Sequence, residues 1–238
     1  MVIYLQRIPK KQPFTKADPT VIAITGGAQG IGLEIARTFL DKHETGSVKL
    51  VLIDIRGDLL AQLDILNQME GHITTIKADL GKQEEIERVW DQIIKKFKRV
   101  DILINNAAIV RGKKLKDLSF AQMKQTVDIN LMAYIHLSML FLKQGSKSED
   151  SKSLHLVNVC SVAGMQGMAR QTDYCTSKFG MRGFSQCLRS ELSDFGPRTR
   201  LTTLYPYTID TGLFDGYNPL MDYLVPKLKT HWVALRSH

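Results

Sequence analysis

Residues 21–32 read VIAITGGAQGIG, and this stretch decides the fold. An apolar run at 21–25 leads into a glycine-rich turn, after which Ile31, Ile35 and Phe39 recur at helical spacing. Such a turn needs glycine where the backbone bends sharply and approaches a ligand closely. We therefore predict a strand, a tight loop and a helix whose amino end can bind phosphate groups.

Apolar segments continue this alternation along the chain. Residues 48–55 are almost continuously apolar, which is typical of a strand covered on both faces of a parallel sheet. Further strands are expected at 72–78, 100–104, 154–159 and 201–205, and helices at 59–66, 82–97, 119–143 and 173–194. This order predicts an α/β fold, a Rossmann-like doubly wound parallel sheet with helices on both faces. We expect a basic arm at 1–20 and a single domain at 21–238, with a substrate loop at 211–226.

Composition excludes several classes of protein. The chain has 44% apolar residues and a net charge of +8, but the basic excess is concentrated in residues 1–20 and 223–238. The body therefore offers no basic groove for nucleic acid. Three cysteines without a CxxC pair indicate neither a zinc site nor a disulfide framework, so we expect no metal. No apolar run approaches the roughly 18 residues that a membrane-spanning helix needs.

Asp54 ends the second expected strand, where a carboxylate can accept both ribose hydroxyls of an adenosine group. The same carboxylate repels a 2′-phosphate, and the glycine-rich turn contains no Lys or Arg. The pattern therefore favours NAD(H) as cofactor, while Arg56 keeps NADP(H) open. A helix cap or turn residue is the alternative interpretation of Asp54.

Tyr174 and Lys178 lie four residues apart in an expected helix and so share one face. Ser161 follows the strand 154–159, at the sheet edge where open α/β folds bind ligands. Free tyrosine, with a pKa of about 10, is too weak a base near neutrality, and a neighbouring cation such as Lys178 favours its phenolate. The alternative is an exposed Tyr and Lys pair without a chemical role.

Several ordered motifs resemble the short-chain dehydrogenase/reductase superfamily over about residues 20–213. They are TGGAQGIG at 25–32, Asp54, Asp79, NNAA at 105–108, Asn130, Ser161, YCTSK at 174–178, and Pro206 through Thr211. The resemblance implies that Tyr174 is the general acid/base and that Ser161 orients the substrate oxygen. It also implies that Lys178 binds the nicotinamide ribose and that Asn130 supports a proton relay.

The resemblance further implies a dinucleotide site. Its expected residues are Gly26, Ala28, Gln29, Gly30, Ile31, Gly32, Asp54, Ile55, Asp79, Leu80, Asn106, Ala107, Ala108, Tyr174, Lys178, Pro206, Ile209 and Thr211. Within this set Asp79 and Leu80 should hold the adenine; Asn105 and Ala107 should line the adenosine ribose, and Ile109 should close the floor. The chain departs from the family pattern at Ala108 and Tyr207, where glycine is usual.

Residues 174–192 and 201–216 resemble the branch that contains retinol dehydrogenases and 17-beta-hydroxysteroid dehydrogenases, as does Ile-Pro-Lys-Lys at 8–11. That branch implies NAD(H)-dependent interconversion of a lipophilic alcohol with its ketone or aldehyde, such as a retinoid or steroid. It also implies peripheral membrane contact on the cytoplasmic side of the endoplasmic reticulum or a lipid droplet, or the cytosol if no anchor precedes Met1. The expected helices 119–143 and 173–194 suit a homodimer or homotetramer.

The C-terminus departs most from the family pattern, which continues after Pro206 through another helix and a seventh strand. We expect this C-terminal helix and last strand to be missing, which would leave the strand 201–205 at the sheet edge. The alternative function is therefore a catalytically weak or inactive dinucleotide-binding or lipid-surface scaffold.

Overall fold

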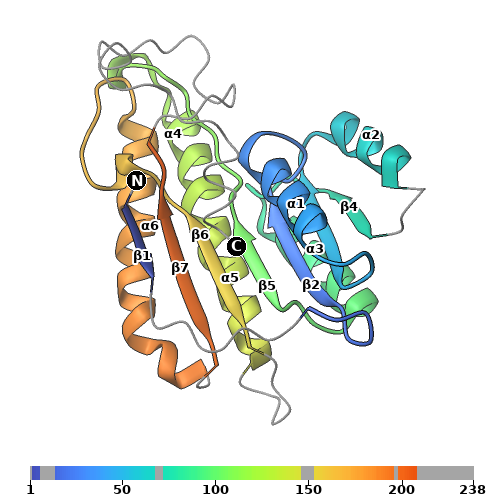
Figure 1. Cartoon of the computed structure of the whole chain (residues 1–238). Helices are drawn as coiled ribbons and strands as arrows, with labels where there is room; N and C mark the ends of the chain where they lie inside the picture. Colours follow the sequence, from blue (N-terminus) through green and yellow to red (C-terminus); the bar gives the residue numbers. More distant parts are fainter. Residues whose placement is uncertain (1, 6–13, 68–71, 146–152, 196–197, 208–238) are drawn as a thin grey trace.

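The computed structural model describes residues 2–5, 14–67, 72–145, 153–195 and 198–207, whose elements are arranged as in Figure 1. In this part of the chain, one sheet has helices packed on both faces. The strand order is β1, β7, β6, β5, β2, β3, β4, and all neighbours from β7 to β4 pair in parallel. The predicted Rossmann-like α/β fold is therefore confirmed.

The strands coincide with the predicted apolar runs, apart from a first strand that was not predicted. Their bounds are β1 (Val2–Leu5), β2 (Thr20–Thr25), β3 (Val48–Asp54), β4 (Ile73–Lys77), β5 (Ile102–Asn105), β6 (His155–Val159) and β7 (Arg200–Tyr205). The strand order reverses between β2 and β5, so the connections leave in opposite directions at their carboxyl ends. Ligands of open α/β sheets bind at such a point.

The helices form two layers. Their bounds are α1 (Gly30–Lys42), α2 (Gly57–Asn67), α3 (Gln83–Phe97), α4 (Phe120–Val127), α5 (Ala133–Gly145) and α6 (Thr172–Glu191). The apolar side chains of α1 and α2 pack with Ile22, Leu50 and Ile104 on one face of the sheet. Those of α3, α5 and α6 pack with Val51 and Leu103 on the other. Because successive strand residues point to opposite faces, the continuous apolar runs supply both cores.

The strand β7 was expected at an edge of the sheet, and this expectation is wrong. The N-terminal strand β1 pairs with it antiparallel, in a register that joins Val2 to Tyr205 and Leu5 to Thr202. Backbone groups on the outer side of β7 would otherwise need other hydrogen-bond partners. Part of the segment expected as an arm thus belongs to the sheet (Figure 1).

The single helix expected at 119–143 is interrupted. Between α4 and α5 the backbone forms a π-helical turn, Asp128–Met132, with Asn130 fully buried inside it. One extra residue in a turn shifts the faces that the flanking helices present, and π turns often occur at functional sites. Apolar periodicity alone gives no indication of this insertion.

Asp101 joins the amino ends of three strands, β2, β5 and β6, through hydrogen bonds. Its Oδ2 accepts a hydrogen bond from the Val21 amide at 2.8 Å, and its own amide donates to the Val21 carbonyl. Its carbonyl accepts from the amide of His155, and Oδ1 lies 2.8 Å from Nε of Arg99. The carboxylate is 3% exposed, so these partners replace most of its hydration.

We predict that Asp101→Ala lowers the free energy of unfolding by about 1–3 kcal/mol, because it leaves the buried Val21 amide without its acceptor. Urea unfolding followed by circular dichroism measures the loss. Asp18→Ala is the matched control, since Asp18 pairs with the same Arg99 on the surface and should cost at most about 1 kcal/mol. Equal losses in the two variants would contradict the role given to Asp101.

Candidate active site

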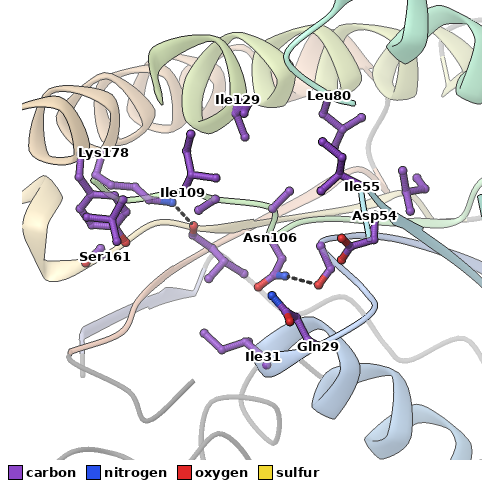
Figure 2. A pocket seen from close by; sticks show the side chains of 18 of the residues that line it. Gln29, Ile31, Asp54, Ile55, Leu80, Asn106, Ile109, Ile129, Ser161 and Lys178 are labelled. Atoms are coloured by element: carbon purple, nitrogen blue, oxygen red, sulfur yellow. Dashed lines mark hydrogen bonds between the residues drawn. The ribbon is translucent and has the colours of Figure 1, made fainter. Parts of the chain in front are cut away.

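A cavity of about 550 Å³ opens at the carboxyl ends of the parallel strands. Its volume lies within the range of about 300–1,000 Å³ that small-molecule sites occupy. Figure 2 shows Ser161 and Lys178 at one end and Asp54, Ile55 and Leu80 at the other. The predicted residues that line it are Gly26, Gln29, Gly30, Ile31, Asp54, Ile55, Asp79, Leu80, Asn106, Ala107, Ala108, Ile109, Ser161, Tyr174, Lys178 and Pro206.

The glycine-rich turn forms one wall of this cavity. Gly26 has φ +64°, a left-handed conformation that side chains disfavour. A Cβ on Gly32 would lie 2.2 Å from the Gly26 carbonyl oxygen, so the start of α1 approaches the end of β2 too closely for any side chain. Gly32 does not itself line the cavity, and it permits the packing that shapes the turn.

Asp54 fixes this turn relative to β3. Its Oδ2 accepts a hydrogen bond from the Ala28 amide and its Oδ1 from the Arg56 amide, both at 3.0 Å. The Arg56 side chain forms an exposed ion pair with Asp58, 2.9 Å away. The carboxylate at this end of the cavity is therefore held by backbone N–H groups, and the nearby guanidinium group is paired with a different acid.

Two adjacent asparagines at the end of β5 behave differently. Asn106 donates from Nδ2 to the carbonyls of Thr25 and Gly26, and so supports the glycine-rich turn from the cavity side (Figure 2). Asn105 is fully buried, and its amide bonds Ser138 and Asn158. The expectation that Asn105 lines the adenosine ribose is wrong, because alternation along the strand turns its side chain toward the helices.

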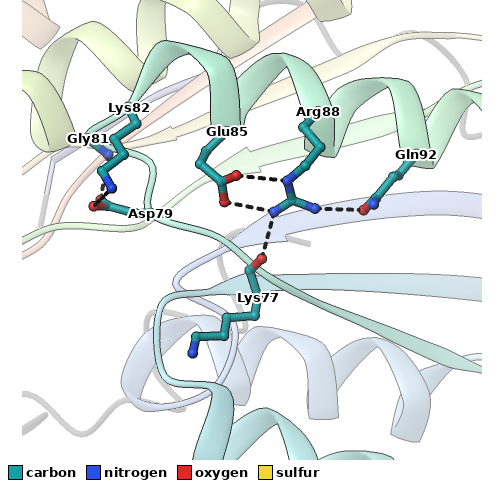
Figure 3. Close-up of polar contacts among 7 residues, drawn as sticks. All are labelled: Lys77, Asp79, Gly81, Lys82, Glu85, Arg88 and Gln92. Atoms are coloured by element: carbon teal, nitrogen blue, oxygen red, sulfur yellow. Dashed lines mark hydrogen bonds and ion pairs between the residues drawn. The ribbon is translucent and has the colours of Figure 1, made fainter.

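The loop after β4 closes the end of the cavity that contains Leu80. Asp79 accepts a hydrogen bond from the Gly81 amide, and its other oxygen lies 4.0 Å from Nζ of Lys82. Arg88 on α3 donates to the Lys77 carbonyl and pairs with Glu85 (Figure 3). These bonds fix the loop between β4 and α3, so that Asp79 and Leu80 face the cavity.

The structure brings Ser161, Tyr174 and Lys178 together at one cavity. Ser161 lies two residues beyond the end of β6, and Tyr174 and Lys178 occupy successive turns of α6. The Ser161 hydroxyl accepts a hydrogen bond from the Ala163 amide at 3.1 Å. Nζ of Lys178 donates to the Val159 carbonyl at 3.0 Å (Figure 2). All three side chains are at most 8% exposed in a site that borders the cavity.

Burial shifts the pKa values of Tyr174 and Lys178 in opposite directions. It raises the pKa of Tyr174 well above its usual value, although the hydrogen bond with Ser161 opposes this shift. It lowers the pKa of Lys178 to about 8, because an ammonium group loses hydration inside the protein. In the chain alone Tyr174 therefore stays protonated near neutral pH, and a nearby positive charge would be needed to make it a stronger acid.

Asn130 does not line the cavity but holds its floor. Its Oδ1 accepts from the Ile109 amide and its Nδ2 donates to the Ile109 carbonyl, each at 2.8 Å. Nδ2 also donates to Oγ of Ser177, one turn beyond Asp173, whose carboxylate accepts from Thr126. The π-helical turn is thus joined to both the pocket floor and α6.

Several lining residues were not predicted as part of the site. They are Ile53, Arg56, Ala78, Val110, Arg111, Gln125, Ile129, Val159, Cys160 and Tyr207. Only its position next to Asn130 in the sequence could have indicated that Ile129 lines the cavity. No sequence pattern marked Arg111 or Gln125, because their hydrogen bond joins a loop to helix α4. Ala108, the replacement for glycine, packs against the cluster of Tyr174, Cys175 and Ala163.

Some predicted residues cannot be placed in this geometry. Ile209, Thr211 and the substrate loop 211–226 lie outside the described residues. Ala28 acts through its backbone bond to Asp54 and does not line the cavity. In the described part of the chain, no helix combines the length and the apolar character needed to cross a membrane.

Comparisons with known proteins agree with this architecture. The sequence pattern of the family described as short chain dehydrogenase matches residues 20–220. Short-chain dehydrogenase/reductase family 16C member 6 of Bos taurus is 30% identical over 98% of this chain and 72% of the relative. Epidermal retinol dehydrogenase 2 of Mus musculus is 32% identical, over 90% and 68% respectively.

A solved structure, 4-hydroxyisoleucine dehydrogenase complexed with NADH, superposes with a TM-score of 0.80 at 24% identity. The match covers 91% of this chain and 88% of that one, which supports the fold. The sequence relatives and the family pattern together carry the assignment. The chain belongs to the short chain dehydrogenase family of oxidoreductases.

Proposed function

We propose that the protein is an NAD(H)-dependent oxidoreductase that interconverts a lipophilic alcohol and its carbonyl compound, with Tyr174 as general acid/base. One observation carries the proposal: Ser161, Tyr174 and Lys178 line the same cavity as Asp54 and the glycine-rich turn. Groups suited to proton transfer thus share one cavity with groups suited to holding a dinucleotide.

The fit of a nicotinamide dinucleotide rests on the shape and charge of the cavity. Gly26 and Gly30 have positive φ and leave the turn open to a pyrophosphate, which the amino end of α1 would favour. Asp54 would accept the ribose hydroxyls and repel a 2′-phosphate, so we propose NAD(H) over NADP(H). Arg56, the cation that would favour a 2′-phosphate, is paired with Asp58.

The chemistry needs a proton transfer at the substrate oxygen. A bound nicotinamide supplies or accepts hydride at the substrate carbon. The Ser161 hydroxyl would hold the oxygen, and Tyr174 would donate a proton to it during reduction or remove one during oxidation. Lys178 would favour the phenolate by its positive charge and bind the nicotinamide ribose. Ile209 and Thr211 would contact the carboxamide.

The proposed substrate class is a retinoid, a steroid or a related lipophilic alcohol, ketone or aldehyde. Val110 and Ile109 give the cavity apolar walls near Tyr174, as such a substrate requires. One relative is named an epidermal retinol dehydrogenase. We place the enzyme on the cytoplasmic face of the endoplasmic reticulum or on lipid droplets.

We also propose that the chain forms a homodimer or homotetramer. Met132 and Met139 are about half exposed and lie seven residues apart, on one side of the π-helical turn and α5. Phe179 on α6 is 43% exposed. A second copy that covers these side chains would remove their apolar surface from water.

We predict that Tyr174→Phe lowers turnover of a retinoid or steroid alcohol by about 10²- to 10⁴-fold, the usual contribution of a general acid/base. Its dissociation constant for NADH should stay within about twofold, since the hydroxyl acts on the substrate oxygen. Steady-state kinetics and a nicotinamide fluorescence titration measure the two quantities. If NADH binds to the unaltered chain but none of a set of retinoid and steroid alcohols and carbonyl compounds is turned over, the scaffold alternative replaces this proposal.

We predict that Asp54→Ala weakens NADH binding by about 10- to 100-fold, because it removes a charged acceptor of hydrogen bonds. NADPH binding should change less, so the preference between the cofactors narrows. Asp91→Ala is the control for NADH affinity, as Asp91 is exposed on α3 and does not line the cavity. Unchanged selectivity in Asp54→Ala would mean that another residue reads the ribose.

A further inference from the structure

Tyr134 is a fully buried tyrosine beside the proposed site. It lies in the first turn of α5 and packs with Cys160, Met181 and Tyr205. Its hydroxyl oxygen is buried, and no hydrogen-bond partner for it exists among the described residues. A buried hydroxyl without a partner costs stability, so the hydroxyl does not explain why a tyrosine stands here.

The ring of Tyr134 faces the ammonium group of Lys178. Nζ lies 5.2 Å from the centroid of this ring and 5.5 Å from the centroid of the Tyr174 ring. Both distances fall within the roughly 6 Å over which a cation is attracted to an aromatic face. The ammonium group thus contacts two aromatic rings, and it donates one hydrogen bond, to the Val159 carbonyl.

The contact between Lys178 and the Tyr134 ring is important because Lys178 is buried. The side chain is 1% exposed, and burial lowers its pKa to about 8. Among the described residues, the titratable groups that face it are the Cys160 thiol after β6, the Tyr134 phenol on α5 and the Tyr174 phenol on α6. Burial raises the pKa of Tyr134 and of Cys160, which keeps both groups neutral and protonated near neutral pH.

A charged lysine in this position therefore depends on weak stabilisers. The Val159 carbonyl is one, and the faces of the two rings are the others. Tyr174 is assigned to proton transfer and carries changing charge during the proposed reaction. The Tyr134 ring takes no part in that transfer and can stabilise the ammonium group throughout.

We propose that Tyr134 is a positioning residue whose ring face, and not its hydroxyl, keeps the Lys178 ammonium group charged and in place beside Tyr174. The inference rests on the proposed function for its catalytic consequence. Its physical basis, a contact between a ring and a cation, does not depend on any substrate.

The ring and the hydroxyl can be tested separately. Tyr134→Phe keeps the aromatic face, whereas pentafluorophenylalanine at position 134 keeps the shape of the ring but reverses the charge of its face. Tyr134→Leu removes the ring altogether. The matched shapes of the two aromatic variants keep the test valid even if Tyr134→Leu does not fold.

The first readout is the titration of Lys178 itself, in cofactor-free protein. NMR of protein carrying ¹³C at the lysine Cε follows this titration, with the signal assigned by its loss in Lys178→Met. Without the cation–π contact the ammonium group releases its proton more readily. We expect the pKa of Lys178 to fall by about 0.5–1 unit with pentafluorophenylalanine or Leu and by less than about 0.2 with Phe.

The second readout is the pH dependence of kcat/KM for the NAD-linked reaction. Its alkaline limb, which reports loss of the Lys178 charge, should move to lower pH by the same amount in the same variants. Identical titrations in all folded variants would overturn the proposal, as would a shift in Tyr134→Phe as large as that with pentafluorophenylalanine. The two proposals can fail separately. If the pKa of Lys178 shifts as expected but neither the unaltered protein nor any variant turns over substrate, the proposed function is wrong, while the contact between the Tyr134 ring and Lys178 is confirmed.

Discussion

The hydrogen bond between two buried asparagine amides, Asn105 and Asn158, is the interaction on which the rest of the site depends. They are register partners at the carboxyl ends of β5 and β6, and Nδ2 of Asn105 lies 3.0 Å from Oδ1 of Asn158. From this pair, bonds reach Ser138 on α5 and Ser185 on α6. One buried network therefore sets the strand register and positions both helices that bear the tyrosines around Lys178. Any slip of β5 against β6 would leave several polar groups unsatisfied in the core, which is costly at low dielectric.

This rigid frame holds Lys178 in place although burial of its ammonium group is energetically unfavourable. A buried ammonium group without an acidic partner is costly, and its pKa is lowered accordingly. The fold compensates with one carbonyl and two aromatic faces, which attract a cation without neutralising it. A carboxylate in the same place would hold the charge more firmly but would cancel its influence on Tyr174. A full positive charge next to a phenol thus requires neutral neighbours, and α5 and the end of β6 provide them.

The sequence predicted much of the parallel sheet and of the cavity because both depend on local patterns. Apolar runs such as 48–55 and the glycine-rich turn carry their own signals, and the spacing of Tyr174 and Lys178 places them on one face of a helix. The remaining features depend on contacts between distant segments. The π-helical turn around Asn130 shows no change in apolar period. Both Asn105 and Asn106 were expected at the site, but only Asn106 lines the cavity, because alternation along the strand turns the Asn105 side chain to the opposite side. The strand β1 is short, and its partner comes from the other end of the described chain.

The pairing of β1 with β7 constrains the order in which these strands can join the sheet. Ribosomes release the N-terminal strand first, yet its partner follows some two hundred residues later in the register that joins Val2 to Tyr205. The strand β1 therefore leaves the ribosome long before it can enter the sheet, since β7 must already lie beside β6 before β1 has an edge to bind. Until β7 has paired with β6, β1 stays unpaired and available to chaperones or to a second nascent chain.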